Sequence, residues 1–261
     1  MTGKVRQITD GPAISHPSYF LQSSFFPGGK SMFFTSYRSG NAQLWKISLE
    51  TNETRQLTHG APIHPYSPAL HPNGKDLIVT RGGSLWTVSL HNKGSDRLIF
   101  EAIGAELGEC SISPDGEWLT AAYKRGNESG LIVGRFDGSG WHAIPFPRTV
   151  IHPQFHPLDP TWIEFAGDPA PRMHRVRRDG TGLACLYQHG NDEFIVHETF
   201  LRSTGDIVDF MRGCDLFDFK DLEPFQSEIR RQTHAPRLTP QQLARKAGCP
   251  KLTIVNTRWV Q

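Results

Sequence analysis

The amino-acid sequence predicts an all-β protein: a β-propeller with about five recognisable blades, followed by an irregular or helical basic C-terminal tail. A turn phrase made of proline or serine, a turn residue and glycine returns five times, the fourth copy being degenerate. The copies are 45, 42, 43 and 46 residues apart, and a run of strand-forming residues follows each. A period of this length without helical patterning is typical of propeller blades. The copies begin at Pro27, Pro72, Pro114, Pro157 and Ser203.

Each repeat is predicted to hold four strands, in the order inner, middle, third and outer. Residues 44–49 and 85–90 carry a Leu-Trp pair followed by alternating polar and apolar residues, which indicates half-buried third strands. An outer-strand phrase follows the first of these over residues 54–58. Asp-Gly pairs at 137–138 and 179–180 supply residues that tolerate positive φ, as tight hairpins require.

The N-terminal residues 5–9 repeat the outer-strand phrase of residues 54–58, although no inner strands precede them. They are therefore predicted to form an outer strand that closes the ring by joining a blade whose other strands come from the C-terminal end. Such closure removes exposed strand edges. The alternative is that five blades close into a ring of their own, in which case residues 5–9 would pair near residues 216–219.

The strand period is lost after Phe219, which divides the chain into a propeller over residues 1–221 and a divergent tail over residues 222–261. From residue 226 onward the tail has seven Lys and Arg and one acidic residue. Residues 238–248 are predicted to form a short helix, with an N-cap threonine, a proline at its first position and a glycine at its end. The tail is either a surface appendage or foreign sequence after an early stop of the propeller.

The composition limits the kinds of partner that the chain is expected to have. With a formal net charge of +2, nucleic acid is not an expected partner, and weak polyanion binding by the basic tail is the minor alternative. Four scattered cysteines without a Cys-x-x-Cys pair fit a reducing compartment better than a disulfide framework. Neither an apolar signal core nor a stretch of roughly 20 apolar residues is present. We therefore expect a cytoplasmic protein without a membrane partner, and the oligomeric state stays open.

Histidine is frequent, with 12 residues, and four of them lie a few residues before a turn phrase, on or near predicted inner strands. Inner strands line the channel of a propeller, so these four are expected to converge on one face. Neutral imidazole binds divalent metals and acts as a general base near neutral pH; the alternative is a set of hydrogen-bonded structural residues. No Gly-x-Ser-x-Gly, P-loop, His-Glu-x-x-His or paired-carboxylate motif supports a hydrolase or a nucleotide-dependent enzyme. The four histidines are His16, His64, His152 and His197.

A His-Pro pair at His152 is followed 45 residues later by a His-Glu pair at His197. Together with the stretches around them, which cover about residues 4–220, these pairs resemble the oligogalacturonate lyases, a polysaccharide lyase family with a seven-bladed propeller. The stretches are 150–157, 159–160, 163–165, 178–181 and 196–200, and near the start 5–9, His16, 19–20 and 33–36.

The resemblance implies β-elimination on short galacturonides derived from pectin. A base removes the C5 proton of a uronate, the glycosidic bond at C4 breaks, and an unsaturated product leaves. A divalent metal, usually manganese, neutralises the uronate carboxylate and stabilises the enolate-like intermediate. On this match His152 is the expected catalytic base and His197 one metal ligand, while His16, His64 and Gln154 are candidates for the substrate channel.

The sequence also departs from the family. The other metal ligands of the family lie in a Gln-x-x-His-x-His stretch of the last blade, which is absent here. Where the family has a channel arginine, one blade before the base, this chain has Gly130 and Leu131, with Arg125 and Arg135 nearby. Five blades are recognisable against seven. We therefore expect weak or absent lyase activity, and the alternative is a non-catalytic propeller that binds an acidic saccharide or a protein partner.

Overall fold

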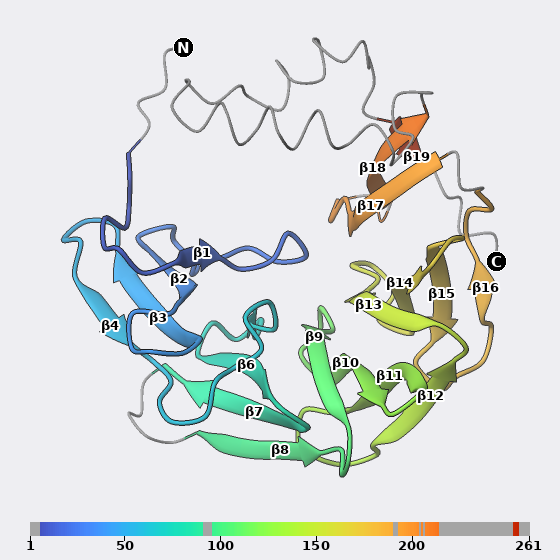
Figure 1. The fold of residues 1–261 in the computed structure, drawn as a ribbon, viewed down its shortest axis with the longest axis horizontal. Coiled ribbons are helices and arrows are strands. Elements are labelled where there is room, and N and C mark those ends of the chain that lie inside the picture. The colour runs from blue at the N-terminus through green and yellow to red at the C-terminus, as the bar shows by residue number, and fades with distance from the viewer. Residues whose placement is uncertain are drawn as a thin grey trace.

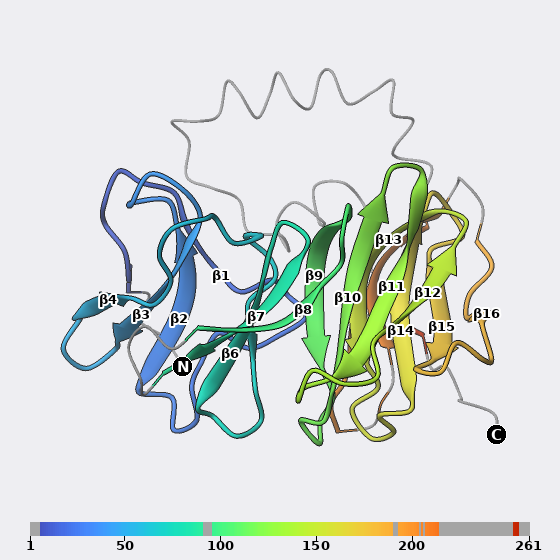
Figure 2. The same ribbon diagram turned by 90° about the horizontal axis from the view of Figure 1, so that it is seen from below.

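The computed structural model describes residues 6–90, 96–189, 193–203, 205, 207–213 and 253–255. Every regular element in this described part is a β-strand, and the strands form five antiparallel sheets, four of them with four strands and one with three. The sheets stand side by side around a common centre (Figures 1 and 2). The predicted all-β propeller with five recognisable blades is therefore confirmed.

Each blade is a meander whose strands pair in sequence order, and the first strand of each lies nearest the centre (Figure 1). Blade 1 holds β1 (Ser15–Pro17), β2 (Ser31–Ser36), β3 (Gln43–Ser48) and β4 (Thr54–Gln56). Blade 2 holds β5 (Ala69–Leu70), β6 (Asp76–Arg81), β7 (Ser84–Ser89) and β8 (Arg97–Glu101). Blade 3 holds β9 (Glu106–Ile112), β10 (Trp118–Arg125), β11 (Glu128–Arg135) and β12 (His142–Phe146). Blade 4 holds β13 (Thr149–Phe155), β14 (Trp162–Asp168), β15 (Met173–Arg177) and β16 (Ala184–Cys185). Blade 5 holds β17 (Glu193–Phe200), β18 (Ile207–Gly213) and β19 (Thr253–Val255).

The hydrophobic core lies between neighbouring blades. One cluster joins blades 2 and 3 and contains Ile78 and Leu119, both fully buried. A second joins blades 3 and 4 through residues such as Val133 and Ile163, and a third joins blades 1 and 2. Alternating strand residues explain this arrangement, because blades 2, 3 and 4 are each covered by another blade on both faces. The core therefore fixes each inner strand against the next.

Two of the repeated turn glycines, Gly116 and Gly205, are explained by contacts between blades. A Cβ atom on Gly116 would lie 2.7 Å from the His71 ring of the preceding blade, and one on Gly205 would lie 2.6 Å from the His156 ring. Both glycines also have positive φ, 77° and 75°. Only a residue without a side chain meets both demands at low cost, so the turn phrase is also a docking point between blades.

The predicted N-terminal strand over residues 5–9 is wrong for the part that the structure describes. Residues 6–9 are not in a strand. Arg6 instead donates from Nη2 to the carbonyl oxygen of Leu49 and to Asn52 Oδ1, at the outer side of blade 1. A strand needs the backbone of a neighbour to pair with. Val5 and the alternative partners near 216–219 lie outside the described residues.

The C-terminal tail contributes one described strand. β19 pairs with β18 as the third strand of blade 5, from Ile207 opposite Val255 to Asp209 opposite Thr253. The predicted helix over residues 238–248 lies outside the described residues, and the division of the chain at residue 221 stays a prediction. In the described part, no helix is long and apolar enough to cross a membrane.

Candidate active site

Two histidines stand at matching places of neighbouring inner strands. His152 lies in β13 and His197 in β17, and at each of them the register with the middle strand shifts. Both have positive φ, 57° and 63°, which is uncommon for residues other than glycine. A bulge re-aims a side chain, and the two imidazole rings lie 6.1 Å apart between centroids. Unusual backbone of this kind clusters at functional sites, which makes both positions candidates for function.

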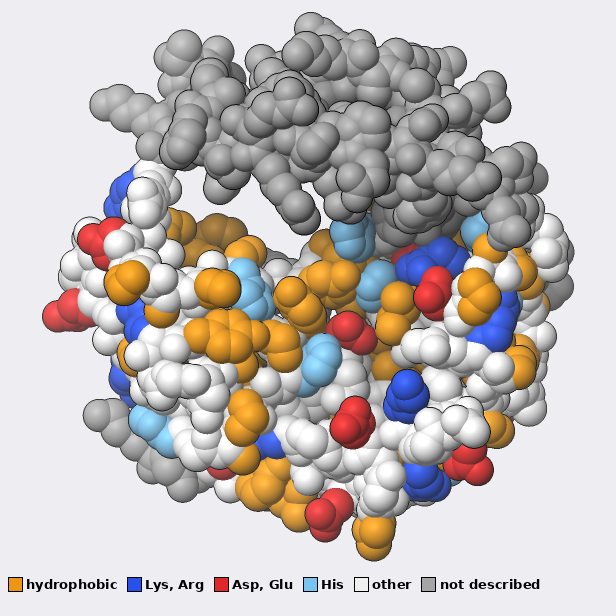
Figure 3. Space-filling view, viewed as in Figure 1, with side chains coloured by type: hydrophobic (Ala, Val, Ile, Leu, Met, Phe, Trp, Pro, Cys, Tyr) orange, Lys and Arg blue, Asp and Glu red, His pale blue; other side chains and the backbone are white. Residues whose placement is uncertain are grey.

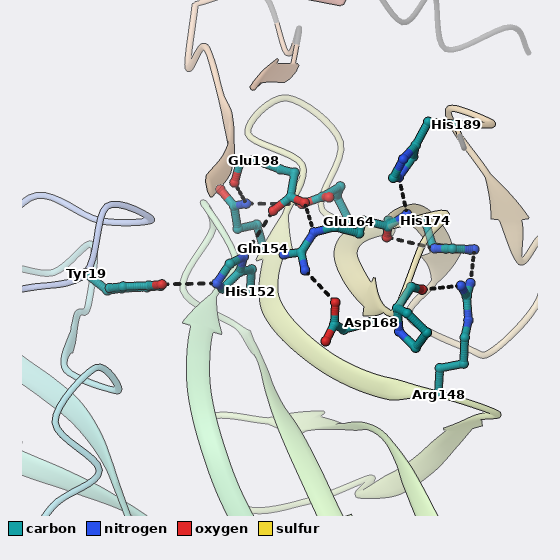
Figure 4. A network of polar contacts seen from close by, with 11 residues as sticks. Tyr19, Arg148, His152, Gln154, Glu164, Asp168, His174, His189 and Glu198 are labelled. Atoms are coloured by element: carbon teal, nitrogen blue, oxygen red, sulfur yellow. Dashed lines mark hydrogen bonds and ion pairs between the residues drawn. The ribbon is translucent and has the colours of Figure 1, made fainter. Parts of the chain in front are cut away.

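A buried carboxylate orients His152. Glu198 Oε2 lies 3.0 Å from His152 Nδ1, and its Oε1 accepts a hydrogen bond of 3.0 Å from Arg172 Nε. Arg172 is held from its other side by Asp168, at 2.9 Å between Nη1 and Oδ1. Burial opposes ionisation of Glu198, but the hydrogen bond from His152 and the charge of Arg172 outweigh it and lower the pKa of this carboxyl to about 2. Figure 4 shows this network.

The ionised carboxylate also sets the tautomer of the histidine. Because Glu198 can only accept, His152 Nδ1 carries the proton, and Nε2 presents its lone pair. Tyr19 Oη lies 3.2 Å from Nε2, so the phenol donates to it (Figure 4). Burial, followed by the nearby Glu109, raises the pKa of Tyr19 and keeps it a phenol. His152 therefore has the orientation and the tautomer that a general base needs.

Ring contacts through Tyr66 and Tyr19 link the channel candidates His16 and His64 to His152. Tyr66 lies 5.1 Å from the His16 ring and 6.1 Å from the His64 ring, and its own ring is 4.7 Å from that of Tyr19, all between centroids. Burial lowers the pKa of His64, although Glu109 opposes this. Figure 3 shows histidine and hydrophobic side chains around the centre of this face. Blades 1 and 2 thus supply an aromatic wall to the mouth that holds the base.

Gln154 is close to the base, but its amide is bonded within the protein. Its Nε2 donates to Glu164 Oε2 at 3.1 Å and to the backbone oxygen of Glu198 at 2.7 Å. Its Oε1 accepts from Thr199 Oγ1 at 3.2 Å. Gln154 therefore ties the inner strands of blades 4 and 5 together, and its role toward a substrate stays a prediction. Gln154 and Phe155 both line a cavity of about 940 Å³.

The described residues do not fit a divalent metal. No group of three His, Cys, Asp or Glu side chains in this part of the chain could hold an ion. His197 is exposed, and its ring packs 4.7 Å from Phe20 and 5.9 Å from Tyr19 between centroids. Burial and the neighbouring His152 lower the pKa of His197. His234, the only histidine after His197 in the sequence, lies outside the described residues.

Sequence reasoning missed three members of the site. Glu198 directly follows His197 and was visible as half of the His-Glu pair. Tyr19 belongs to the N-terminal stretch of the resemblance, but no sequence signal places it on the base. Arg172 comes from the loop between β14 and β15 and had no signal at all. The arginines considered from the sequence lie elsewhere: Arg125 pairs with Glu128, and Arg135 lies over Trp118.

Comparisons with known proteins identify β-propeller proteins that are similar to this chain. No protein-family model matches the chain. The oligogalacturonate lyase of Dickeya dadantii (strain 3937) is 19% identical over 262 aligned residues, covering 89% of this chain and 68% of that protein. A solved oligogalacturonate lyase from Vibrio parahaemolyticus superposes with a TM-score of 0.70 at 19% identity, covering 78% of this chain and 62% of that one.

Two further solved structures are similar to this chain, and one of them is a putative TolB. An oligogalacturonate lyase in complex with manganese gives a TM-score of 0.70 at 19% identity, covering 79% of this chain and 63% of that one. A putative TolB from Agrobacterium tumefaciens gives 0.62 at 19% identity, covering 82% and 75%. This chain thus spans less than two thirds of the solved lyases. Because TolB also matches, the structural similarity establishes the propeller fold alone, and the lyase similarity is distant.

Proposed function

We propose that this propeller is a lyase that cleaves short acidic oligosaccharides of galacturonate by β-elimination, with His152 as the general base. The observation that carries the proposal is the buried His152–Glu198 pair, which fixes the imidazole and directs Nε2 toward Tyr19 at the channel. The distant similarity to an oligogalacturonate lyase supports the same substrate class.

The chemistry follows from the state of each group. His152 Nε2 takes the C5 proton of the uronate, a C4–C5 double bond forms, and the C4–O bond breaks toward oxygen. The leaving oxygen takes a proton from water, and His152 later returns its own proton to solvent. Glu198 accepts from Nδ1 throughout, so that it stabilises the imidazolium that appears on the base. Arg172 keeps Glu198 ionised. The base therefore gains a proton beside a fixed negative charge, and this lowers the barrier.

We assign no step of the reaction to a divalent metal, and we expect the lack of one to affect only the rate of turnover. A divalent ion, as manganese in the related lyase complex suggests, would neutralise the uronate carboxylate. The described residues offer no ligand group for it, and no step here depends on one. Without that neutralisation, loss of the C5 proton adds charge next to an existing carboxylate. We therefore expect slow turnover.

The first test is the absorbance of unsaturated uronates during incubation with digalacturonate, with manganese either added or chelated. The wild type should produce a slow rise that chelation leaves unchanged, and His152→Ala should abolish the rise. Calorimetric titration of the His152→Ala variant with digalacturonate should still detect binding. A robust rise that requires manganese would contradict the metal-independent mechanism.

A non-catalytic propeller that binds an acidic saccharide is the second candidate. The observation in its favour is the combination of an aromatic and histidine wall at Tyr66, Tyr19 and His16 with the lack of a ligand group in the described part. Saccharide binding by a folded wild type that shows no rise in absorbance would establish it. In that case His152→Ala would change the affinity for the saccharide, and neither the wild type nor the variant would show turnover.

A further inference from the structure

Tyr19 reaches the base from a loop that blade 1 inserts into the channel. Residues 18–30 join β1 to β2, whereas the corresponding turn in blade 3 spans only residues 113–117. Ser18 N–H donates to Ser24 Oγ at 2.8 Å, which closes the base of the inserted loop. Between these two residues the loop leaves the sheet and carries Tyr19 across to blade 4.

Contacts with two other segments, besides the one with His152 in blade 4, hold the loop in place. Gln22 Nε2 donates to the backbone oxygen of Cys110 in blade 3 at 3.0 Å. The Tyr19 ring lies 4.5 Å from Phe20 and 4.7 Å from Tyr66 between centroids. A loop fixed in this way positions the phenol oxygen of Tyr19 reproducibly against His152, where it covers a base that is only 4% exposed.

The distance between Tyr19 Oη and His152 Nε2 has a stereochemical consequence. A proton donor and a proton acceptor 3.2 Å apart reach the substrate from the same side. They can serve one elimination together only when the C5–H and C4–O bonds lie on the same face of the uronate ring. Glycosidases follow the same logic, because the separation of their two catalytic groups sets the stereochemical course. In galacturonate these two bonds lie on opposite faces, whereas in glucuronate and mannuronate they lie on the same face.

We infer that Tyr19 is a catalytic acid paired with His152, and that the pair cleaves 4-linked uronides of gluco or manno configuration by elimination on one face. The inference rests on the proposed role of His152 as a base. It adds a substrate class to galacturonide and does not require that galacturonide is cleaved.

The step balances within the pair. When substrate binds, the Tyr19 hydroxyl turns from Nε2 to the leaving oxygen, which frees the Nε2 lone pair to take the C5 proton. The electron pair of the C5–H bond forms the C4–C5 double bond. The C4–O bond breaks toward oxygen, which takes the phenolic proton of Tyr19. The resulting phenolate then recovers a proton from His152 through their own hydrogen bond. Both residues return to their starting states, and no oxidant, reductant or water is consumed.

The test compares 1,4-linked diglucuronate with digalacturonate, whose uronate rings differ only at C4. The wild type should cleave diglucuronate. Tyr19→Phe should lower kcat on diglucuronate by about 100-fold or more with little change in KM, as expected for the loss of a general acid. On digalacturonate the same variant should change kcat by less than about tenfold, because Tyr19 cannot protonate a leaving oxygen on the far face.

Tyr123→Phe is the matched control, since it removes the hydroxyl of a buried tyrosine in the core between blades 2 and 3, outside the site, and should leave kcat on both substrates within about threefold. Circular dichroism verifies the fold of each variant. A wild type that does not cleave diglucuronate, or equal kcat losses in the two tyrosine variants, would overturn the inference. Cleavage of diglucuronate alone would instead overturn the galacturonide proposal, and cleavage of neither substrate would overturn both.

Discussion

Glu198 is a fully buried carboxylate held between an imidazole and a guanidinium, and its charge contributes to stability. Its pKa falls from an ordinary 4.5 to about 2 in the folded protein. A folded pKa below the unfolded value means that the stabilisation is present above about pH 4.5 and is lost as the pH falls toward 2. The shift corresponds to roughly 3 kcal/mol of unfolding free energy.

Urea unfolding at pH 6 and at pH 3 measures this contribution. The wild type should lose more unfolding free energy between the two pH values than Glu198→Gln, which cannot ionise at that position. Other carboxylates titrate equally in both proteins, so the difference isolates Glu198. Equal losses in the wild type and the variant would show that the carboxylate is not held by its neighbours.

The second prediction at this scale concerns turnover. Glu198→Gln should lower kcat by about 10²- to 10⁴-fold, because an amide no longer fixes the tautomer of His152 or stabilises its protonated form. Asp168→Asn is the control: it removes the other carboxylate on Arg172, and the effect should be small because the Asp168 side chain is 55% exposed. Steady-state rates of uronide cleavage check both variants, and equal losses would assign the effect to Arg172 instead.

The residues of the site were only partly predictable. His152 and His197 follow from their positions before turn phrases, and the structure does bring them together. Arg172 could not be predicted, since it enters from a loop of irregular length whose direction no periodicity encodes. Tyr19 was equally hidden, because its contact joins residues separated by 133 positions in the sequence. Long-range contacts of this kind arise only once the blades are placed.

At the scale of single elements, the turn glycines give a prediction about blade docking. Gly116→Ala places a Cβ 2.7 Å from the His71 ring at a φ of +77°, whereas Gly29→Ala, at the same place in blade 1 with a φ of +67°, meets nothing within 4 Å. Both variants should lose about 1–3 kcal/mol of unfolding free energy from the backbone conformation. Gly116→Ala should lose more, by the cost of moving the ring. Urea midpoints at unchanged slope measure both, and equal losses would show that the contact between blades is dispensable.

Strands and turns were the most predictable elements, because alternation and turn glycine are local signals. The degenerate fourth turn also forms: the Asp159 carboxylate accepts from the backbone N–H of Thr161 at 3.0 Å and from its hydroxyl at 2.6 Å, where other copies use glycine. The failure at residues 6–9 has the opposite cause. Their strand-like pattern is local, but strand formation depends on a partner that the pattern does not encode.

At the scale of the whole molecule, the period predicts how many blades occur but not how they complete a ring. Five sheets stand around a common centre (Figure 1), and three of the blades contribute side chains to one site. Blade 1 supplies Tyr19, blade 4 supplies His152, and blade 5 supplies Glu198. Any change that moves blade 5 relative to blade 4 should therefore disturb the base as well as the fold.

Because β19 pairs with β18, residues after the predicted boundary at 221 contribute to blade 5. A chain that ends at residue 221 loses β19 and leaves β18 as an unpaired edge, which favours association with other chains. We expect it to unfold at a Tm at least about 4 °C lower than the full chain and to form larger species in size-exclusion chromatography. A chain that ends at residue 256 keeps β19 and is the matched control. If the shorter chain kept the Tm of the full chain and stayed the same size, the boundary at residue 221 would be supported, and β19 would be dispensable for the propeller.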